Sequence, residues 1–421
     1  MSARSLADWL VRLEGLHPSE IDMGLERVRV VAERLGVLAP APLVFTVTGT
    51  NGKGSTCAAL DSLLRHAGLR TGCYTSPHLV HYNERVRLDG QLADDEDLCA
   101  AFAAIDAARG DISLTYFEFG TLAALWLFKR AGLDAVVLEV GLGGRLDAVN
   151  VVDASVAVVT SIGIDHQEYL GSTRESVAAE KAGILRAGRP VISGERALPE
   201  TFVQVVERLG CPLVQRERDF RLDVLADGQW RLTGQGGLGA SRALGLPPVR
   251  LPRDNLAVAL QAFWAAGLDM SDQALGEALA AASATGRLES RSLDWQGAQR
   301  ELVLDVGHNP HAAAFLSESL RQQGARRRVA VFGLLADKDL EGVLAPLLDL
   351  FDGWFVAPLP SPRSRSAAEL QRVLEQQGAT VKTAPSVAAA LEQALIDTSA
   401  DTEIVIFGSF FCVADAILWL S

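Results

Sequence analysis

The sequence predicts an α/β protein of two domains: a larger N-terminal domain with a mostly parallel sheet, and a smaller, doubly wound C-terminal domain. Short apolar runs typical of buried strands alternate with stretches of helical apolar spacing, a pattern that favours helix-covered parallel sheets. The length of 421 residues exceeds what one ordinary core supports. The pattern breaks near residues 288–298, and we place the domain boundary there.

Apolar periodicity and glycine or proline breakers predict the elements of the N-terminal domain. Residues 5–14 and 24–38 have helical spacing. Residues 43–48 (LVFTVT) form an apolar run of strand length, and a glycine-rich turn separates it from a helix over 56–67. The further elements expected are a helix over 119–131, strands over 135–140, 156–161 and 190–193, a helix over 173–187, a small β-rich excursion over 214–250, and helices over 255–267 and 271–284.

A second series of strands, with helices in the gaps, predicts the C-terminal domain. Its strands are expected over 301–306, 328–333, 354–357, 379–383 and 403–408. Thr-Gly-Arg and Trp-Gln-Gly interrupt the pattern before the first of them. We therefore divide the chain into a domain over 1–288, a linker over 289–298 and a domain over 299–421.

Composition and charge exclude several classes of protein. Hydrophobic residues make up 49% and charged residues 22%, which is typical of a globular chain with a large core. Lys and Arg number 39 against 52 Asp and Glu, so the net charge is −13. This acidic balance excludes a broad basic surface for nucleic acid or an anionic membrane. An anionic substrate would need a local cluster of cations, backbone amides or metal ions.

Cysteine usage and the N-terminal residues indicate the cellular compartment of the protein. The five cysteines are scattered without a C-x-x-C pair, so we expect neither a disulfide framework nor a thiolate zinc site. Charged residues interrupt the apolar residues of the N-terminus, which is not the pattern of a signal peptide. The chain has no apolar run of about 18 residues that would predict a membrane span. We expect a cytoplasmic protein.

The first motif with chemical meaning is a glycine-rich loop between a strand and a helix. It runs Thr48-Gly49-Thr50-Asn51-Gly52-Lys53-Gly54-Ser55-Thr56. Glycines let backbone N–H groups converge on phosphate oxygens, the helix N-terminus adds positive potential, and Lys53 supplies a charge. The alternative is a plain glycine-rich turn, but the flanking strand and helix favour a phosphate loop. The fold class is then a P-loop mononucleotide-binding domain followed by a smaller Rossmann-like α/β domain.

Acidic and histidine side chains follow the next two predicted strands. Glu139 ends a strand and precedes the sequence GLGGRLDAVN over 141–150. A carboxylate at the carboxyl end of a parallel strand points into the ligand crevice, where it commonly holds Mg²⁺ near nucleotide phosphates. Alternatively, Glu139 only caps the strand. Asp165 and His166 follow the strand after that, and spacing alone leaves a metal role and a structural role equally open.

Four further residues are candidates for a functional role. Lys181, in a helix, would ordinarily be a solvated side chain, although a buried lysine can be kept neutral and become modified. Asp305 and His308 lie at the carboxyl edge of the C-terminal domain, where they either touch a nucleotide or form an Asx-type turn before Pro310. Arg287 either reaches the phosphates or is an ordinary linker arginine.

Taken in order, these motifs resemble the folylpolyglutamate synthase family, in its bacterial form that is also dihydrofolate synthase, which belongs with the Mur ligases. The resemblance covers nearly the whole chain. Its further motifs are Ile21 to Val28, Ser76 to Leu79, Tyr82 to Val86, Tyr116 to Phe119, Glu180 to Ile184, Asp337 to Asp339 and Gly408 to Phe410. A phosphate loop alone is a weak signal, whereas the full ordered set is highly specific.

The resemblance implies roles for individual residues. It implies that ATP is bound by Thr50, Asn51, Gly52, Lys53, Gly54, Ser55, Asn255, Arg287, Asp305 and His308. It implies magnesium ligands at Ser76, Glu139, His166 and Lys181, with Lys181 carbamylated to help bind a second Mg²⁺. Catalytic roles then fall to Lys53, Lys181, His166 and Arg287.

The resemblance also implies a pocket for a pterin-bearing acid. Its residues would be Asp22, Met23, Gly24, Leu25, Thr115, Tyr116, Phe117, Asp147 and Ala148. Phe117 would stack on the flat ring system, and polar groups would fix the edge of the ring.

The family reaction is ATP-dependent amide formation. The γ-phosphoryl group of ATP converts the carboxylate of 7,8-dihydropteroate or a tetrahydrofolate into an acyl phosphate, and the amine of L-glutamate then displaces phosphate. The resemblance implies Mg²⁺ at two sites, ATP as co-substrate and a monomer. A form that only adds glutamates to folates is the first alternative.

Two rival functions are more distant. A Mur-type ligase for cell-wall amino acids shares the chemistry, but the segments Ser76 to Leu79 and Tyr116 to Phe119 favour the folate branch. A nucleotide switch that ligates nothing is disfavoured by Glu139, His166 and Lys181 together, because a switch needs no second metal.

Overall fold

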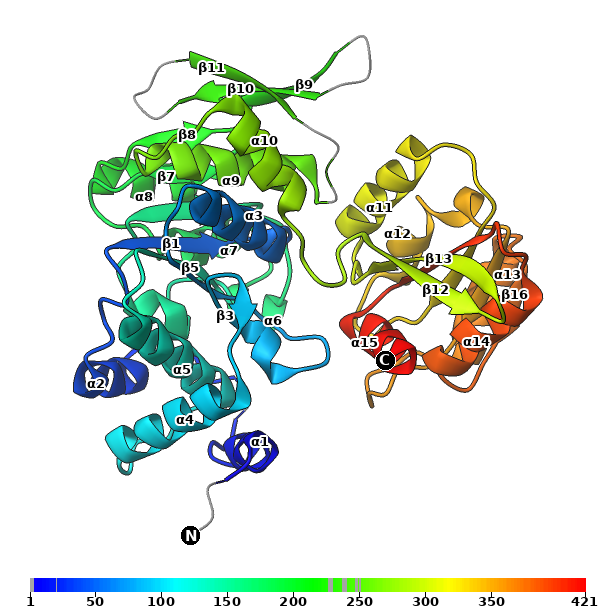
Figure 1. Cartoon of the computed structure of the whole chain (residues 1–421), viewed down its shortest axis with the longest axis horizontal. Coiled ribbons are helices and arrows are strands. Elements are labelled where there is room, and N and C mark those ends of the chain that lie inside the picture. The colour runs from blue at the N-terminus through cyan, green and yellow to red at the C-terminus, as the bar shows by residue number, and fades with distance from the viewer. Residues whose placement is uncertain (1–3, 20, 226–229, 237–240, 247–248, 250) are drawn as a thin grey trace. The chain divides into compact units, whose positions relative to one another are not determined.

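The chain consists of two compact units, Met1–Ala282 and Ser283–Ser421 (Figure 1). The structure is a computed structural model that describes residues 4–19, 21–225, 230–236, 241–246, 249 and 251–421. In this part of the chain no helix is long and apolar enough to cross a membrane.

The N-terminal unit is built on an eight-stranded sheet with the order β4-β3-β2-β5-β1-β6-β7-β8. The six neighbouring strands β2, β5, β1, β6, β7 and β8 pair in parallel, which agrees with the mostly parallel sheet that was predicted. Strand β2 itself and the antiparallel edge formed by β3 and β4 were not predicted. The strands are β1 (Leu43–Thr48), β2 (Thr71–Tyr74), β3 (Val86–Leu88), β4 (Gln91–Leu92), β5 (Ala135–Glu139), β6 (Val156–Val159), β7 (Val191–Ser193) and β8 (Leu213–Gln215).

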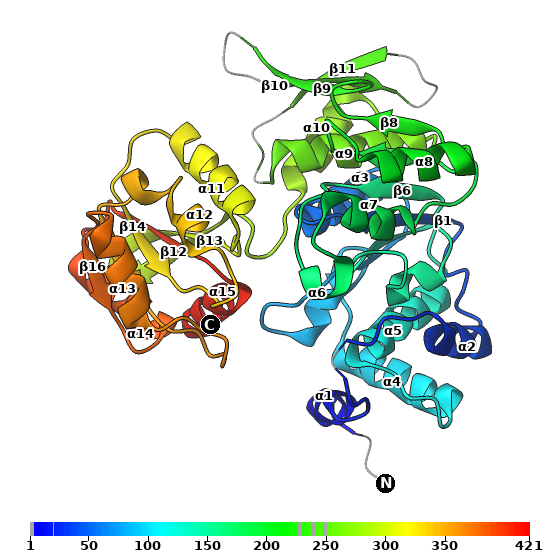
Figure 2. The same cartoon turned by 180° about the vertical axis from the view of Figure 1, so that it is seen from behind.

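Helices cover this sheet in two groups (Figures 1 and 2). One group contains α1 (Leu6–Glu14), α2 (Glu26–Leu35), α4 (Asp95–Arg109) and α5 (Tyr116–Ala131), and the other contains α3 (Lys53–His66), α9 (Arg253–Ala265) and α10 (Asp272–Ala281). Strand residues are buried on both faces: Val136 and Leu138 join the core of the first group, and Val137 between them points the other way. The remaining helical elements are η1 (Tyr82–Arg85), η2 (Ala148–Val151), α6 (Gln167–Leu170), α7 (Arg174–Ala182) and α8 (Glu200–Leu209).

A small antiparallel sheet confirms the β-rich excursion predicted over 214–250. Its order is β11-β10-β9, with β9 (Arg221–Val224), β10 (Trp230–Gln235) and β11 (Ser241–Leu246). Parts of the predicted excursion, at 226–229, 237–240, 247–248 and 250, lie outside the described residues.

The C-terminal unit carries a six-stranded sheet with the order β12-β13-β17-β14-β15-β16, parallel except for the β12–β13 hairpin. The strands are β12 (Glu289–Trp295), β13 (Ala298–Asp305), β14 (Arg328–Phe332), β15 (Gly353–Val356), β16 (Val381–Thr383) and β17 (Glu403–Phe407). The helices are α11 (Pro310–Gln322), α12 (Leu340–Leu344), η3 (Leu348–Leu350), α13 (Ala367–Gln376), α14 (Val387–Asp397) and α15 (Phe410–Leu420).

The linker predicted over 289–298 is wrong, because these residues form β12 and the turn into β13. Gln296 and Gly297 have φ values of 55° and 83°, as the two central residues of a tight hairpin turn require. The exposed residues of β12 alternate with half-buried ones, so its composition looked like a linker. The two units divide between Ala282 and Ser283, ahead of the predicted limit at residue 288.

Candidate active site

The topology of the N-terminal sheet brings several predicted site segments to one edge. Strand β1 lies between β5 and β6 and is parallel to both, so the loops that follow these three strands emerge side by side. Strand β2, on the other side of β5, also runs parallel and leads to Ser76. Ligands of open α/β sheets bind at this carboxyl edge.

The phosphate loop leads directly into helix α3. Gly52 has a φ of 88°, which glycine adopts without strain, and α3 begins at the next residue, Lys53. A Cβ atom at Gly52 would lie 2.5 Å from Oδ1 of Asn255, so the side chain of Asn255 rests against the loop. The N-terminus of α3, whose backbone N–H groups can bind an anion, therefore lies next to the amide side chain of Asn255.

Two hydroxyl side chains after β6 hold the loop in shape. The Oγ1 atom of Thr160 donates a hydrogen bond of 2.6 Å to the carbonyl of Asn51, and the N–H of Asn51 donates one of 2.9 Å to Oγ of Ser161. The Oγ1 atom of Thr50 bonds to the carbonyl of Gly163 over 2.9 Å. Sequence reasoning missed Thr160 and Ser161, although hydroxyl residues just after a strand were a usable signal.

Glu139 lies between the phosphate loop and the segment after β2. Its side chain is buried, and Oε2 accepts a hydrogen bond of 3.2 Å from the N–H of Ser76. A Cβ atom at Gly54 would lie 3.7 Å from the same oxygen. The Glu139 carboxylate thus lies beside the first turn of α3, with the backbone of Ser76 bonded to it. Carboxylate and serine hydroxyl oxygens are hard donors that suit Mg²⁺.

The remaining predicted metal ligands are His166, which precedes α6, and Lys181, which lies in α7. His166 directly precedes α6, has a φ of 48°, and its side chain is half exposed. Its backbone N–H donates a hydrogen bond of 2.9 Å to Oδ1 of Asp165. Within the described residues, no three His, Cys, Asp or Glu side chains form a metal cluster by themselves. Any Mg²⁺ held here would therefore also need ligands from phosphate, water or a modified side chain.

Lys181 is deeply buried in α7, with 2% of its surface exposed. Burial is the main reason that the pKa of its amine falls to about 7, and the positive charge of Lys53 lowers it further. Asp165 and Asp147 oppose this change. At neutral pH a substantial fraction of the amine is therefore neutral and nucleophilic.

The glycine-rich turn after β5 contacts both predicted pterin segments. A Cβ atom at Gly141 would lie 2.6 Å from Cζ of Phe117, and one at Gly143 would lie 3.8 Å from Cε of Met23. The ring of Phe117 also lies 6.1 Å from that of Tyr74. The segments 22–25 and 115–117, distant in sequence, thus converge on one turn.

The same turn reaches the phosphate loop and the helix of Lys181. The hydroxyl of Thr48 donates to the carbonyl of Gly143 over 2.7 Å. A Cβ atom at Gly144 would lie 3.3 Å from Cα of Lys181, so the two backbones touch. Residues 141–147 therefore connect three parts of the predicted site.

Asp147 ends this turn as a buried carboxyl group. Burial raises its pKa to about 7, although hydrogen bonds from the N–H groups of Leu142 (2.8 Å) and Val149 (3.0 Å) oppose the increase. Ala148 follows it in η2 and is buried.

The other predicted pterin residues lie as follows. Asp22 pairs with Arg27, and Leu25 directly precedes α2. Thr115 caps α5. Tyr116, the next residue, packs its ring against Tyr82 at 5.8 Å.

The C-terminal unit brings its own predicted residues together at the end of β13. Asp305 is buried, which raises the pKa of its carboxyl group, and the charge of Arg287 partly offsets this. The Arg287 guanidinium lies 5.6 Å from the ring centre of Phe410, and the His308 ring lies 6.0 Å from it. Arg287, Asp305 and His308 thus form one cluster, with Phe410 as a member that sequence reasoning did not assign to the site.

Two domain families match the chain. The Mur ligase middle domain matches residues 47–193, and the Mur ligase, glutamate ligase domain matches residues 286–410. Together with the phosphate loop and the two α/β units, these matches define a ligase of the Mur type.

Relatives that match nearly the whole chain identify the family more narrowly. The dihydrofolate synthase/folylpolyglutamate synthase of Escherichia coli is 48% identical over 414 residues, which cover 98% of this chain and 95% of that protein. The Haemophilus influenzae protein of the same name is 42% identical, over 97% of this chain and 96% of its own. The chain belongs to the dihydrofolate synthase/folylpolyglutamate synthase family.

Solved structures agree with this assignment. Escherichia coli FolC in complex with DHPP and ADP has a TM-score of 0.91 at 47% identity and covers 99% of this chain and 97% of its own. The bifunctional enzyme of Yersinia pestis, complexed with AMPPNP and Mn ion, has a TM-score of 0.89 at 45% identity, over 99% and 98% of the two chains. The family, the fold class and the class of enzyme predicted from the sequence are therefore confirmed.

Proposed function

We propose that this protein joins L-glutamate to 7,8-dihydropteroate and to tetrahydrofolates, with ATP converting the acceptor carboxylate into an acyl phosphate. The turn over 141–147 carries this proposal. It contacts Phe117, Met23, the phosphate-loop strand at Thr48 and the helix of Lys181. An acid bound against Phe117 and Met23 would thus lie beside the loop that holds the transferring phosphoryl group, and positioning of this kind supplies much of the rate gain.

We propose that the phosphate loop and Lys53 bind ATP, and that Ser76, Glu139 and His166 hold a first Mg²⁺. Bound Mg²⁺ would offset negative charge between the phosphates and the carboxylate. Lys53 and the N-terminus of α3 would stabilise charge on the transferring phosphoryl group. Asn255 lies against Gly52, a position from which it can contact the nucleotide.

We also assign the cluster of Arg287, Asp305 and His308 in the C-terminal unit to ATP. A cation beside a flat aromatic ring and a buried carboxyl group would suit a nucleotide. Arg287 would stabilise the phosphates, and Asp305 would orient the ligand.

We propose that Lys181 reacts with carbon dioxide to form a carbamate. The neutral amine attacks the carbon atom, a C–N bond forms, and one proton leaves. Burial of Lys181 and its lowered pKa, to about 7, both favour the neutral amine that this reaction consumes. The resulting carboxylate would replace a cation with an anion and help hold a second Mg²⁺.

We favour the bifunctional form over an enzyme that only extends folates. The relatives at 48% and 42% identity carry both names. The Mycobacterium tuberculosis structure named folylpolyglutamate synthase is 28% identical. We further propose that the protein acts as a monomer in the cytoplasm.

A drop-out assay tests the proposed function. ADP release is measured with Mg²⁺-ATP, L-glutamate and 7,8-dihydropteroate, and each component is omitted in turn. Release that requires both glutamate and dihydropteroate is the expected result. Release only with tetrahydrofolate would restrict the enzyme to polyglutamylation, and silence with both pterins would favour the cell-wall ligase instead.

Replacing Glu139 with glutamine should weaken divalent metal binding. The substitution keeps the shape of the side chain but removes the charge beside Ser76 and the phosphate loop, so Mn²⁺ affinity should fall by about tenfold or more. The Mn²⁺ affinity is measured by electron paramagnetic resonance with the ATP analogue AMPPNP present. Glu175→Gln, at an exposed position of α7, is the matched control. Unchanged Mn²⁺ affinity in Glu139→Gln would remove Glu139 from the ligand set.

Replacing Gly141 with alanine should displace the Phe117 ring. The new Cβ would lie 2.6 Å from its Cζ atom, well inside van der Waals contact. Because the displaced Phe117 ring would bind the pterin less well, we expect KM for dihydropteroate to rise by roughly tenfold while KM for ATP stays nearly unchanged. Gly276→Ala, in open space on α10, controls for the added methyl group. Equal increases in both KM values would show that Phe117 is not specific to the pterin.

A further inference from the structure

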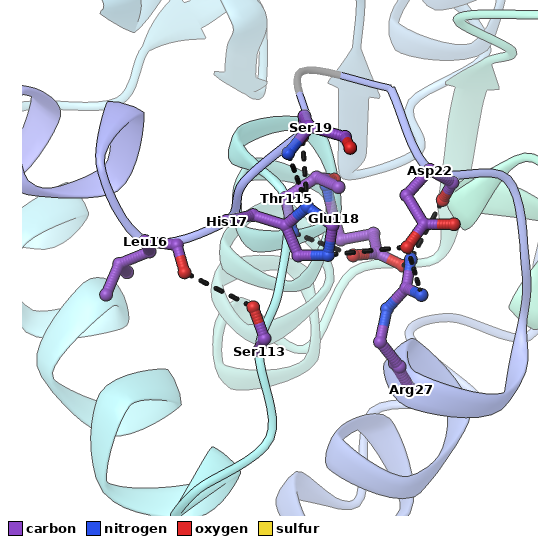
Figure 3. A network of polar contacts seen from close by, with 8 residues as sticks. All are labelled: Leu16, His17, Ser19, Asp22, Arg27, Ser113, Thr115 and Glu118. Carbon is purple, nitrogen blue, oxygen red and sulfur yellow. Dashed lines mark hydrogen bonds and ion pairs between the residues drawn. The ribbon is translucent and has the colours of Figure 1, made fainter.

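One guanidinium group connects the two halves of the proposed pterin pocket (Figure 3). Arg27, in the first turn of α2, donates from Nη1 to Oδ2 of Asp22 over 2.6 Å and from Nη2 to the Asp22 carbonyl over 2.8 Å. The same Nη2 atom donates to Oε1 of Glu118 over 3.0 Å. Arg27 therefore binds the segment that carries Met23 and, at the same time, a carboxylate on α5.

Glu118 controls the turn that carries Phe117. Its other oxygen, Oε2, accepts a hydrogen bond of 2.8 Å from the N–H of Thr115, and the N–H of Glu118 donates to Oγ1 of Thr115 over 3.1 Å. This reciprocal capping box fixes the start of α5. Because only 3% of Glu118 is exposed, loss of a close cationic partner for its carboxylate would destabilise the fold.

Two further polar contacts belong to this network (Figure 3). Nε2 of His17 lies 3.3 Å from Oδ2 of Asp22, and Oγ of Ser113 donates to the carbonyl of Leu16 over 3.2 Å. The His17 contact is an ion pair only when the imidazole is protonated. Within this network, Arg27 makes the charged link that spans from the 22–25 segment to α5.

We propose that Arg27 is a positioning residue that holds the 22–25 segment at a fixed place relative to Phe117 and thereby sets the affinity for the pterin-bearing acid. This inference rests on the function proposed above. A planar guanidinium presents several N–H donors in a rigid fork and so fixes two acceptors relative to each other. An ammonium group is a flexible point charge without this geometry, and a neutral side chain such as methionine has no donor. Arg27 acts through Asp22 and Glu118 and needs no contact with the substrate.

A simpler role is that Arg27 only neutralises the buried charge of Glu118. The two roles are separated by comparing Arg27→Met with the double variant Arg27→Met/Glu118→Gln. The glutamine introduced by the second substitution keeps a carbonyl oxygen for the Thr115 N–H and carries no charge, so the double variant no longer buries an unpaired carboxylate. It still lacks the link to Asp22.

The experiment measures Kd for 7,8-dihydropteroate by calorimetry in the presence of AMPPNP and Mg²⁺, together with KM for each substrate and the melting temperature. We expect Kd to rise roughly 10- to 100-fold in both variants, while KM for ATP changes less than about twofold. The melting temperature should fall in Arg27→Met and recover in the double variant. Arg29→Met, an exposed position on the same helix, removes the same charge and should behave as the wild type.

Two results would overturn the inference. The first is recovery of wild-type Kd in the double variant, which would reduce Arg27 to a counter-ion for Glu118. The second is wild-type Kd in Arg27→Met itself. If Arg27→Met does not fold, the double variant decides alone. Failure of the wild-type protein to bind dihydropteroate would contradict the proposed function, a different result from either of these.

Discussion

Substitution of Lys53 by methionine should lower kcat by about 10³-fold while the protein remains folded. The Nζ atom of Lys53 donates to the carbonyl of Gly49 over 2.9 Å, which places the ammonium group on the loop proposed to hold the phosphates. Methionine has a similar length but no charge. It would leave charge on the transferring phosphoryl group without this stabilisation.

The measurement is steady-state ADP release at saturating ATP, glutamate and dihydropteroate, with thermal melting to verify folding. Lys129→Met, an exposed lysine of α5, is the control for loss of one positive charge. A decrease in kcat of less than about tenfold for Lys53→Met would place the catalytic charge elsewhere and contradict the role given to the loop.

Substitution of Lys181 by methionine should abolish most activity and yet stabilise the fold. Activity should fall by about 10³-fold, because the carbamate proposed to hold a second metal cannot form. In carbon-dioxide-free buffer, where Lys181 is a free amine, stability should rise because burial lowers the pKa of this amine from 10.5 to about 7, which corresponds to a cost of at most about 4 to 5 kcal/mol at neutral pH. Methionine fills a similar volume without that cost.

The pH dependence of stability gives a second readout of Lys181. Between about pH 7 and 10.5 the unfolded chain holds the lysine proton that the folded chain has released, so wild-type stability should rise with pH across this window. Below about pH 7 both states are protonated and the contribution is constant. Urea unfolding of Lys181→Met in carbon-dioxide-free buffer should lack this rise. Parallel wild-type and variant curves would show that the amine is not perturbed.

A smaller variant tests whether the carboxylate of the carbamate matters. Lys181→Ala leaves space where a small acid can bind, so added acetate or propionate should restore part of the activity. The same acids should not restore Lys181→Met, whose side chain fills the space. Absence of rescue in Lys181→Ala, together with full activity in Lys181→Met, would remove the carbamate from the mechanism.

Much of the fold follows from local sequence. The strand predicted over 43–48 coincides with β1, because an apolar run between a proline and a glycine leaves little choice of structure. Helix α3 begins at Lys53 rather than at residue 56, since the last residues of the phosphate loop already form its first turn. The predicted strand–loop–helix arrangement around residues 49–52 is present in the structure.

Other features could not be derived locally. Helix α4 (Asp95–Arg109) is an exception: it was not predicted, although Asp94 is a recognisable local N-cap signal. The bond between Arg27 and Glu118 joins residues 91 positions apart, and the bonds that join Asn51 with Thr160 and with Ser161 each span more than 100 positions. Such contacts depend on how the sheet and its helices pack, and no pattern in a short window predicts them.

The most direct test of the account follows oxygen atoms through the reaction. Dihydropteroate labelled with oxygen-18 in its glutamate-accepting carboxylate is incubated with Mg²⁺-ATP, L-glutamate and the enzyme, and the inorganic phosphate is examined by phosphorus NMR for the isotope shift. If the carboxylate is activated as an acyl phosphate, one labelled oxygen should appear in each phosphate released together with dihydrofolate. Unlabelled phosphate formed alongside dihydrofolate would contradict the acyl phosphate, and unlabelled phosphate without dihydrofolate would reduce the protein to an ATPase.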